Sequence, residues 1–212
     1  MKFMSTSVLK RWAISAIGLW ALSAGALATT VVPPDFEQLV NESDFVVRAV
    51  VKSVTSEFRT NATGKTIITK VTLDVREVVA GTPPAEVVLQ MLGGKVGDEE
   101  LVLEGAPRFK VGDEDVLFVR DNGRTMVPLV AMMHGRYPVM RENATGRRYM
   151  ARENRIPLTA TAEVALPMTD DATATAAAAR ESTKAPAQAM APEDFVQRVK
   201  ATVNPRYVRA KR

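Results

Sequence analysis

Apolar and polar residues alternate along much of the first 150 positions, and this period of two predicts β-strands. The clearest case covers residues 67–76, where one face is apolar and the opposite face is mostly polar. Strands are predicted over residues 45–54, 67–76, 87–91, 116–119, 126–130, 135–140 and 148–151. A polar loop over residues 55–65, a glycine-rich crossing over 93–109 and a turn at Asp121-Asn122-Gly123 separate them. The chain is therefore expected to be mainly β.

Two short helices complete the predicted elements. The first follows Asp35, whose carboxylate suits a helix start, and it presents Leu39 and Val40 on one side. The second opens at Pro192-Glu193-Asp194 and carries a stripe of Phe195, Val196, Val199 and Val203. A helix this short is marginal in water without a partner. We expect it to return to the β domain, with docking on another molecule as the alternative.

The chain divides into four segments. Residues 1–28 hold a basic start, an apolar stretch and Ala26-Leu27-Ala28, which is typical of a cleaved signal peptide; the alternative is an uncleaved membrane anchor. Residues 29–158 form the predicted β domain. Residues 159–190 are rich in Ala, Thr and Pro and are interpreted as a flexible linker, and residues 191–212 as the helix with a basic terminus. The protein is expected to be exported, to the periplasm or beyond the cell, after cleavage near Ala28.

Composition excludes several kinds of site. The 212 residues contain no Cys and one His, so disulfides, thiolate metal sites and any site with two imidazoles are ruled out. Residues 29–140 carry 12 basic and 16 acidic side chains (12 − 16 = −4), whereas residues 141–212 carry 13 and 8 (13 − 8 = +5). An acidic body disfavours nucleic acid as a partner.

The order of motifs resembles a group of uncharacterised exported bacterial proteins. The residues that carry this resemblance are Leu39-Val40-Asn41-Glu42-Ser43-Asp44, Phe45 to Val51, Val75 to Gly81, Gly105-Ala106-Pro107-Arg108-Phe109, Val111-Gly112-Asp113-Glu114 and Leu117-Phe118-Val119. The strand layout over residues 35–140 is similar to netrin-like modules, which include tissue inhibitors of metalloproteinases. The resemblance implies a small antiparallel OB-like (netrin-like) barrel, with a short N-terminal helix and a separate short C-terminal helix. Inhibition in that family uses an amino-terminal Cys, which this chain lacks.

Candidate ligand-binding residues are few: Gly93, Gly94, His134, Arg136 and Tyr137. The backbone N–H groups of the glycine pair could cradle an anion, although a bent strand crossing is the simpler interpretation. Met132-Met133-His134 offers thioether and imidazole ligands for Cu(I), with core packing as the alternative. We expect no catalytic residue, resident metal or cofactor.

The combined expectation is an exported, non-enzymatic β-barrel module. Its surface groove would bind an envelope or secreted protein or polymer, with no nucleic acid and no membrane span after cleavage. One alternative is a protease inhibitor that acts by loop occlusion. A further alternative is a hydrolase that depends on His134.

Overall fold

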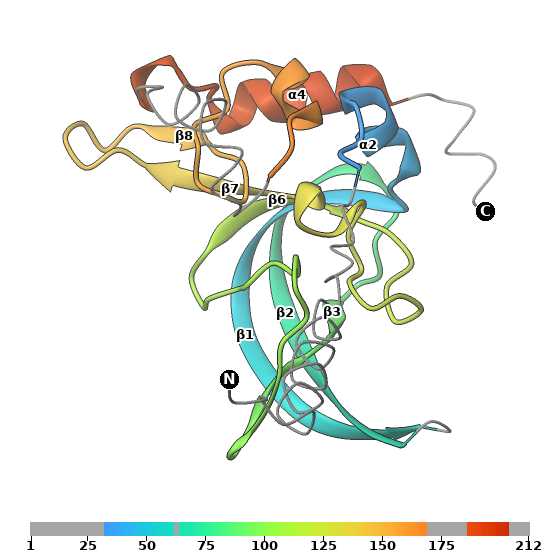
Figure 1. The fold of residues 1–212 in the computed structure, drawn as a ribbon. Helices are drawn as coiled ribbons and strands as arrows, with labels where there is room; N and C mark the ends of the chain where they lie inside the picture. The colour runs from blue at the N-terminus through green and yellow to red at the C-terminus, as the bar shows by residue number, and fades with distance from the viewer. Residues whose placement is uncertain (1–31, 62–63, 169–185, 204–212) are drawn as a thin grey trace, which may run out of the picture. The chain divides into compact units, whose positions relative to one another are not determined.

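The computed structural model describes residues 32–61, 64–168 and 186–203, which form a mainly β fold with short helices (Figure 1). The predicted fold class is confirmed at this level. The predicted signal peptide, the middle of the predicted linker at 169–185 and the basic terminus at 204–212 lie outside the described residues. None of the described helices is long and apolar enough to cross a membrane.

Six antiparallel strands form the main sheet, in the order β3-β2-β1-β6-β7-β8. Their bounds are β1 Phe45–Asn61, β2 Gly64–Gly81, β3 Val87–Leu92, β6 Glu114–Val119, β7 Arg136–Arg141 and β8 Arg148–Met150. Among the described residues no pairing joins β3 to β8, so no closed barrel forms there.

β1 and β2 form one long, curved hairpin (Figure 1). The prediction of a polar loop over residues 55–65 is wrong, because both strands continue to Asn61 and Gly64. Residues 54–61 of β1 are mostly polar apart from Val54 and Phe58. Every residue in this range pairs across the hairpin with a residue of β2. Three register shifts interrupt the pairing, and such irregularities bend a strand.

Both faces of the central strands are buried. On β6, Val116 and Phe118 pack on one face, whereas Leu117 and Val119 pack on the other. β6 is therefore apolar on both sides, which explains its continuous apolar sequence. The helices cover the first face, and the segment that follows β5 (Glu99–Leu101), together with residues 127–132, packs on the second. We call these the helix face and the concave face.

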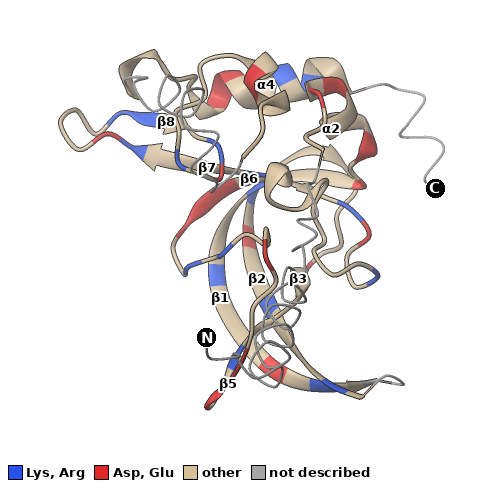
Figure 2. Ribbon diagram, in the orientation of Figure 1, with Lys and Arg blue, Asp and Glu red and all other residues tan. Residues whose placement is uncertain are grey.

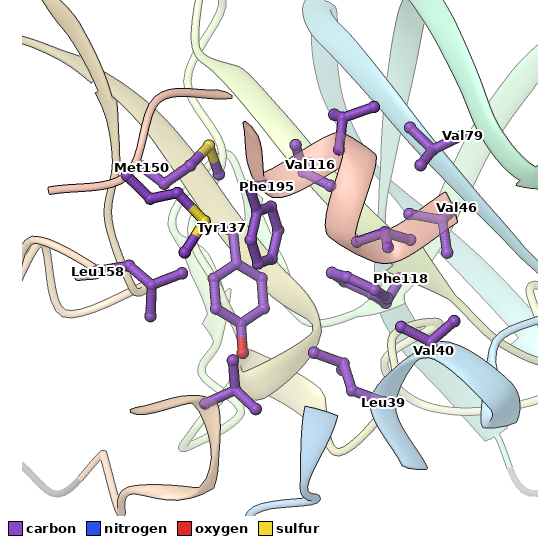
Figure 3. Close-up of a cluster of buried hydrophobic side chains, with 14 of the residues drawn as sticks. Leu39, Val40, Val46, Val79, Val116, Phe118, Tyr137, Met150, Leu158 and Phe195 are labelled. Carbon is purple, nitrogen blue, oxygen red and sulfur yellow. The ribbon is translucent and has the colours of Figure 1, made fainter. Parts of the chain in front are cut away.

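The two predicted helices are confirmed as α2, Phe36–Glu42, and α4, Pro192–Thr202. Asp35 caps α2 by accepting a hydrogen bond from the Gln38 backbone N–H at 2.8 Å. The stripe of α4 is buried against the helix face, where Phe195 lies beside Phe118 and Tyr137 (Figure 3). The helix is therefore docked on the sheet rather than separate. This agrees with the expectation that it returns to the β domain.

The β domain extends beyond residue 158, so the sequence-based boundary needs correction. Residues 161–165 form a 3-10 helix, η2 (Thr161–Ala165), and Val164 in it is buried. After another single turn, η4 (Pro186–Gln188), Met190 hydrogen-bonds the backbones of Met150 and Leu158. Both described ends of the predicted linker are therefore part of the packed domain.

Two local predictions also need correction. The glycine-rich crossing contains a small hairpin, β4 (Gly94–Val96) and β5 (Glu99–Leu101). The strand predicted over 126–130 is reduced to one bridge between Val119 and Leu129. β7 already occupies the rest of that edge of β6, because it pairs with residues 115–117.

Candidate functional site

A cleft of about 240 Å³ lies on the concave face of the sheet. Its floor consists of side chains from three strands, and its opposite wall comes from β5 and the segment that follows it. The floor contains Val54, Ser56, Thr69, Val71 and Met91, and the wall contains Leu101, Val102, Leu103, Ala106 and Phe109. Most of these side chains are apolar, so we call this the apolar cleft.

Gly93 and Gly94 line one end of the apolar cleft. Any side chain at Gly94 would overlap the hydroxyl oxygens of Ser56 and Thr69, and its φ of +131° also disfavours other residues. The Thr69 hydroxyl donates a hydrogen bond to the Gly93 carbonyl at 2.6 Å. These two glycines therefore let β4 cross directly over the β1–β2 hairpin, as the strand-crossing interpretation proposed.

One edge of β1 borders the apolar cleft and has no strand beside it. β6 pairs with β1 only as far as Val50, and two hydrogen bonds then join Val51 to Gly112 and Asp113 at 2.9 and 2.8 Å. Beyond Val51, no described residue pairs with this edge, while the other edge stays paired with β2. We call residues 54–58 of this strand the free edge.

The residues of the free edge alternate in a defined way. Val51 faces the concave side and directs its backbone groups towards the β6 side of the strand. Side chains and backbone groups alternate together along a strand, and the register shift between Val51 and Ser53 moves both by one residue. Concave-facing residues after this shift are therefore even-numbered and share that direction. Val54 and Ser56 face the apolar cleft, and Val54 and Phe58 are 36% and 39% exposed. The N–H groups of Val54, Ser56 and Phe58 therefore point outward along the free edge.

His134 and Tyr137 do not line the apolar cleft. His134 lies in the 3-10 helix η1 (Met132–Gly135) with 2% of its surface exposed, and Tyr137 is buried in the helix-face core at 1% (Figure 3). The methyl groups of Met132 and Met133 lie against Gly105. The described residues contain no group of three or more His, Asp or Glu side chains that could hold a metal ion.

Arg136 is also buried, at 2% exposure, and acts as a cross-link between segments. Its guanidinium donates to Asp115 at 2.9 and 3.2 Å, to Asp113 at 2.8 Å and to the Arg108 carbonyl at 2.6 Å. Glu153 pairs with it at 3.3 Å, and the Phe109 ring lies 4.3 Å away. Burial alone would lower the pKa of Arg136, but Asp115 and Glu153 outweigh it and raise that pKa. Arg136 thus fastens the wall of the apolar cleft to β6 and β7.

The five candidate residues consequently fall into three places: the glycines at the apolar cleft, Tyr137 and His134 in the core, and Arg136 in a buried ion cluster.

No protein family model and no curated protein matches this sequence. The geometry of the chain itself therefore carries the functional proposal.

Two buried groups should shape the dependence of stability on pH. Burial, aided by the positive charge of Arg152, lowers the pKa of His134 from 6.5 to about 4. His134 therefore contributes fully to the stability of the folded protein above pH 6.5, and this contribution is lost as the pH falls towards 4. Burial raises the pKa of Glu153 from 4.5 to about 7, against the attraction of Arg136. That contribution is present below pH 4.5 and is lost as the pH rises towards 7.

These opposite effects predict what a Glu153→Gln substitution does. Relative to this variant, the native protein should lose about 3 kcal/mol of unfolding free energy as the pH rises from 4.5 to 7. In the variant, the gain in stability that His134 contributes between about pH 4 and 6.5 should be opposed less strongly, because Glu153 no longer titrates and of these buried carboxyls only Asp115, whose pKa burial also raises, remains. Urea denaturation at pH 4.5, 5.5 and 7 measures both profiles. Parallel profiles would show that Glu153 titrates normally in the folded protein.

Proposed function

We propose that the chain is a non-enzymatic binding module that takes an extended segment of a partner protein onto its free edge. The carrying observation is that an unpaired strand edge borders an apolar cleft. In strand addition, main-chain hydrogen bonds supply affinity, and pockets for alternate side chains supply specificity. The free edge offers the main-chain hydrogen bonds, and the apolar cleft offers a pocket for a side chain.

The size of the apolar cleft supports a side chain as its occupant. Small-molecule sites usually enclose about 300–1,000 Å³. The apolar cleft, at about 240 Å³, is smaller than that range. A Leu or Phe side chain of a bound strand is of suitable size, and its backbone would remain outside along β1.

The fold analogy agrees with this assignment. We propose that the curved β1–β2 hairpin with β3, β6 and β7 is an open OB-type, netrin-like barrel, and OB-type modules bind ligands across their second and third strands. The apolar cleft lies over β2 and β3. Within this proposal the protein is exported and meets its partner outside the cytoplasm, and no cysteine is needed for binding.

Substitutions at Ser56 test the proposal. Random decapeptides displayed on phage would be selected on the purified protein, and the best one synthesised with a fluorescent label for anisotropy titrations. Ser56→Pro removes the outward N–H and should weaken binding at least about tenfold. Ser56→Ala keeps that N–H and should bind within about twofold.

A second pair of variants covers the case in which Ser56→Pro does not fold. Val102 is 60% exposed at the wall of the apolar cleft, whereas Val111 is 67% exposed and does not line it. Val102→Lys should lower peptide affinity about tenfold, and Val111→Lys should leave it unchanged. Equal affinities for these two variants, or the selection of no peptide at all, would contradict the proposal.

A further inference from the structure

A second cleft, of about 320 Å³, lies beside the β7–β8 hairpin and is lined by four arginines. These are Arg136, Arg141, Arg148 and Arg155, and they are accompanied by Asp113, Glu114 and an apolar strip of Pro138, Val139 and Met140. Residues 136–155 contain six Arg and two Glu, and the ribbon in Figure 2 is blue at the basic positions of β7 and β8. We call this the arginine cleft.

Both acidic residues of the arginine cleft are already paired with cations. Asp113 accepts hydrogen bonds from the Arg136 guanidinium at 2.8 Å and from the Lys110 backbone N–H at 3.2 Å. Glu114 accepts from Arg48 at 2.7 Å and from Arg148 at 3.3 Å. Their negative charge is therefore directed at partners within the fold.

Two of the arginines keep most of their donors unused. Arg141 donates to the Gly146 carbonyl at 3.0 Å. Among the described residues, the Arg155 guanidinium donates only to the Met140 thioether at 3.8 Å, which is a weak acceptor, and its charge also attracts Asp115 and Glu153. Neither forms an ion pair with any carboxylate in the described residues. In addition, the Nε of Arg148 is buried and has no hydrogen-bond partner in the described structure. The uncommitted charge at the arginine cleft is thus positive.

The backbone at Arg155 adds a second observation. Arg155 has a φ of +65°, in the left-handed region that non-glycine residues rarely adopt. A turn holds it there, since the Arg155 N–H donates to the Arg152 carbonyl at 2.8 Å and the Arg152 N–H to the Ile156 carbonyl at 2.9 Å. Strained residues of this kind cluster at binding sites.

We propose that the arginine cleft binds a small oxyanion, a phosphate or carboxylate group, through Arg141, Arg148 and Arg155. Guanidinium groups present a planar fork of donors that matches both kinds of oxyanion. Pro138, Val139 and Met140 line the same cleft, and apolar side chains beside a charged group lower the local dielectric and strengthen its contacts. A volume of about 320 Å³ admits a group larger than inorganic phosphate. This site is separate from the apolar cleft and does not depend on peptide binding.

Calorimetric titration of the full chain with pyrophosphate and, separately, citrate tests this assignment. The double variant Arg141→Gln/Arg155→Asn should weaken binding at least about tenfold, and Asn tolerates the positive φ at position 155. The control is Arg120→Gln/Arg124→Gln, which removes the same charge from residues that do not line the arginine cleft. This control should bind as the native protein does.

The two ligands distinguish the sources of the oxyanion. Tighter binding of pyrophosphate assigns the site to phosphate groups, and tighter binding of citrate assigns it to carboxylates. The proposal is overturned if neither ligand binds saturably. It is overturned equally if the control loses as much affinity as the arginine-cleft variant, because binding would then reflect net charge alone.

Discussion

Replacement of Arg136 by Met should lower the unfolding free energy by about 3–5 kcal/mol, as measured by urea denaturation. Met keeps the apolar stem and removes the charge, which leaves Asp115 fully buried without its cation. Removing one partner of a buried ion pair typically costs this much. If Arg136 instead served as a surface ligand contact, as the sequence suggested, the substitution would change binding and leave stability nearly intact.

Two variants control this prediction. Arg141→Met lies on the same strand, where the side chain is exposed, and should cost less than about 1 kcal/mol. The double variant Arg136→Met/Asp115→Leu should recover part of the loss, because it removes the uncompensated carboxylate as well. Equal losses for Arg136→Met and Arg141→Met would show that the ion cluster contributes little.

Phe195→Ala should cost about 3–5 kcal/mol and release α4 from the sheet. Phe195 is fully buried beside Tyr137 and Phe118 (Figure 3), and its ring centroid lies 5.2 Å and 6.2 Å from theirs. The ring centroid of Phe36 lies 5.8 Å away. Loss of a buried aromatic side chain leaves a cavity that neighbouring rings fill only in part. Urea denaturation measures the loss, and amide exchange at Val196 and Val199 reports the release.

The matched control is Phe58→Ala. Phe58 is 39% exposed on the free edge, so its removal should cost about 1 kcal/mol or less. The docking of α4 is also held by ion pairs, Lys200 with Glu77 at 2.6 Å and Glu193 with Arg48 at 3.2 Å, which are exposed and weak. If Phe195→Ala left exchange at Val196 unchanged, these pairs rather than the aromatic cluster would hold the helix.

Strand prediction succeeded where alternation was sustained and failed where it was short or polar. Residues 67–76 alternate over ten positions, and the structure places them in β2 with the expected apolar face inward. β4 and β5 have only three residues each, too few for a period to be visible. The far half of β1 was missed because Ser, Thr and Glu are typical of loops, although here these residues pair with β2 in a hairpin.

The candidate sites depended on contacts between distant segments. Arg136 was read as a ligand contact, yet its partners come from residues 113, 115 and 153. The sequence did contain a clue in Asp115. Asp115, Leu117 and Val119 alternate along the strand and therefore lie on one face, so the Asp115 carboxylate is expected to point inward and to need a cation. The free edge had no comparable signal, because it exists only where β6 stops pairing with β1.

Amide hydrogen exchange along β1, measured by NMR with the selected peptide at saturation, tests strand addition most directly. Exchange should slow at least about tenfold at Val54, Ser56 and Phe58, whose N–H groups point outward along the free edge. Thr55 and Glu57 already pair with β2, so their exchange should change less, and Val196 in α4 should not change. Unchanged exchange at Val54, Ser56 and Phe58 while the peptide remains bound would contradict the account.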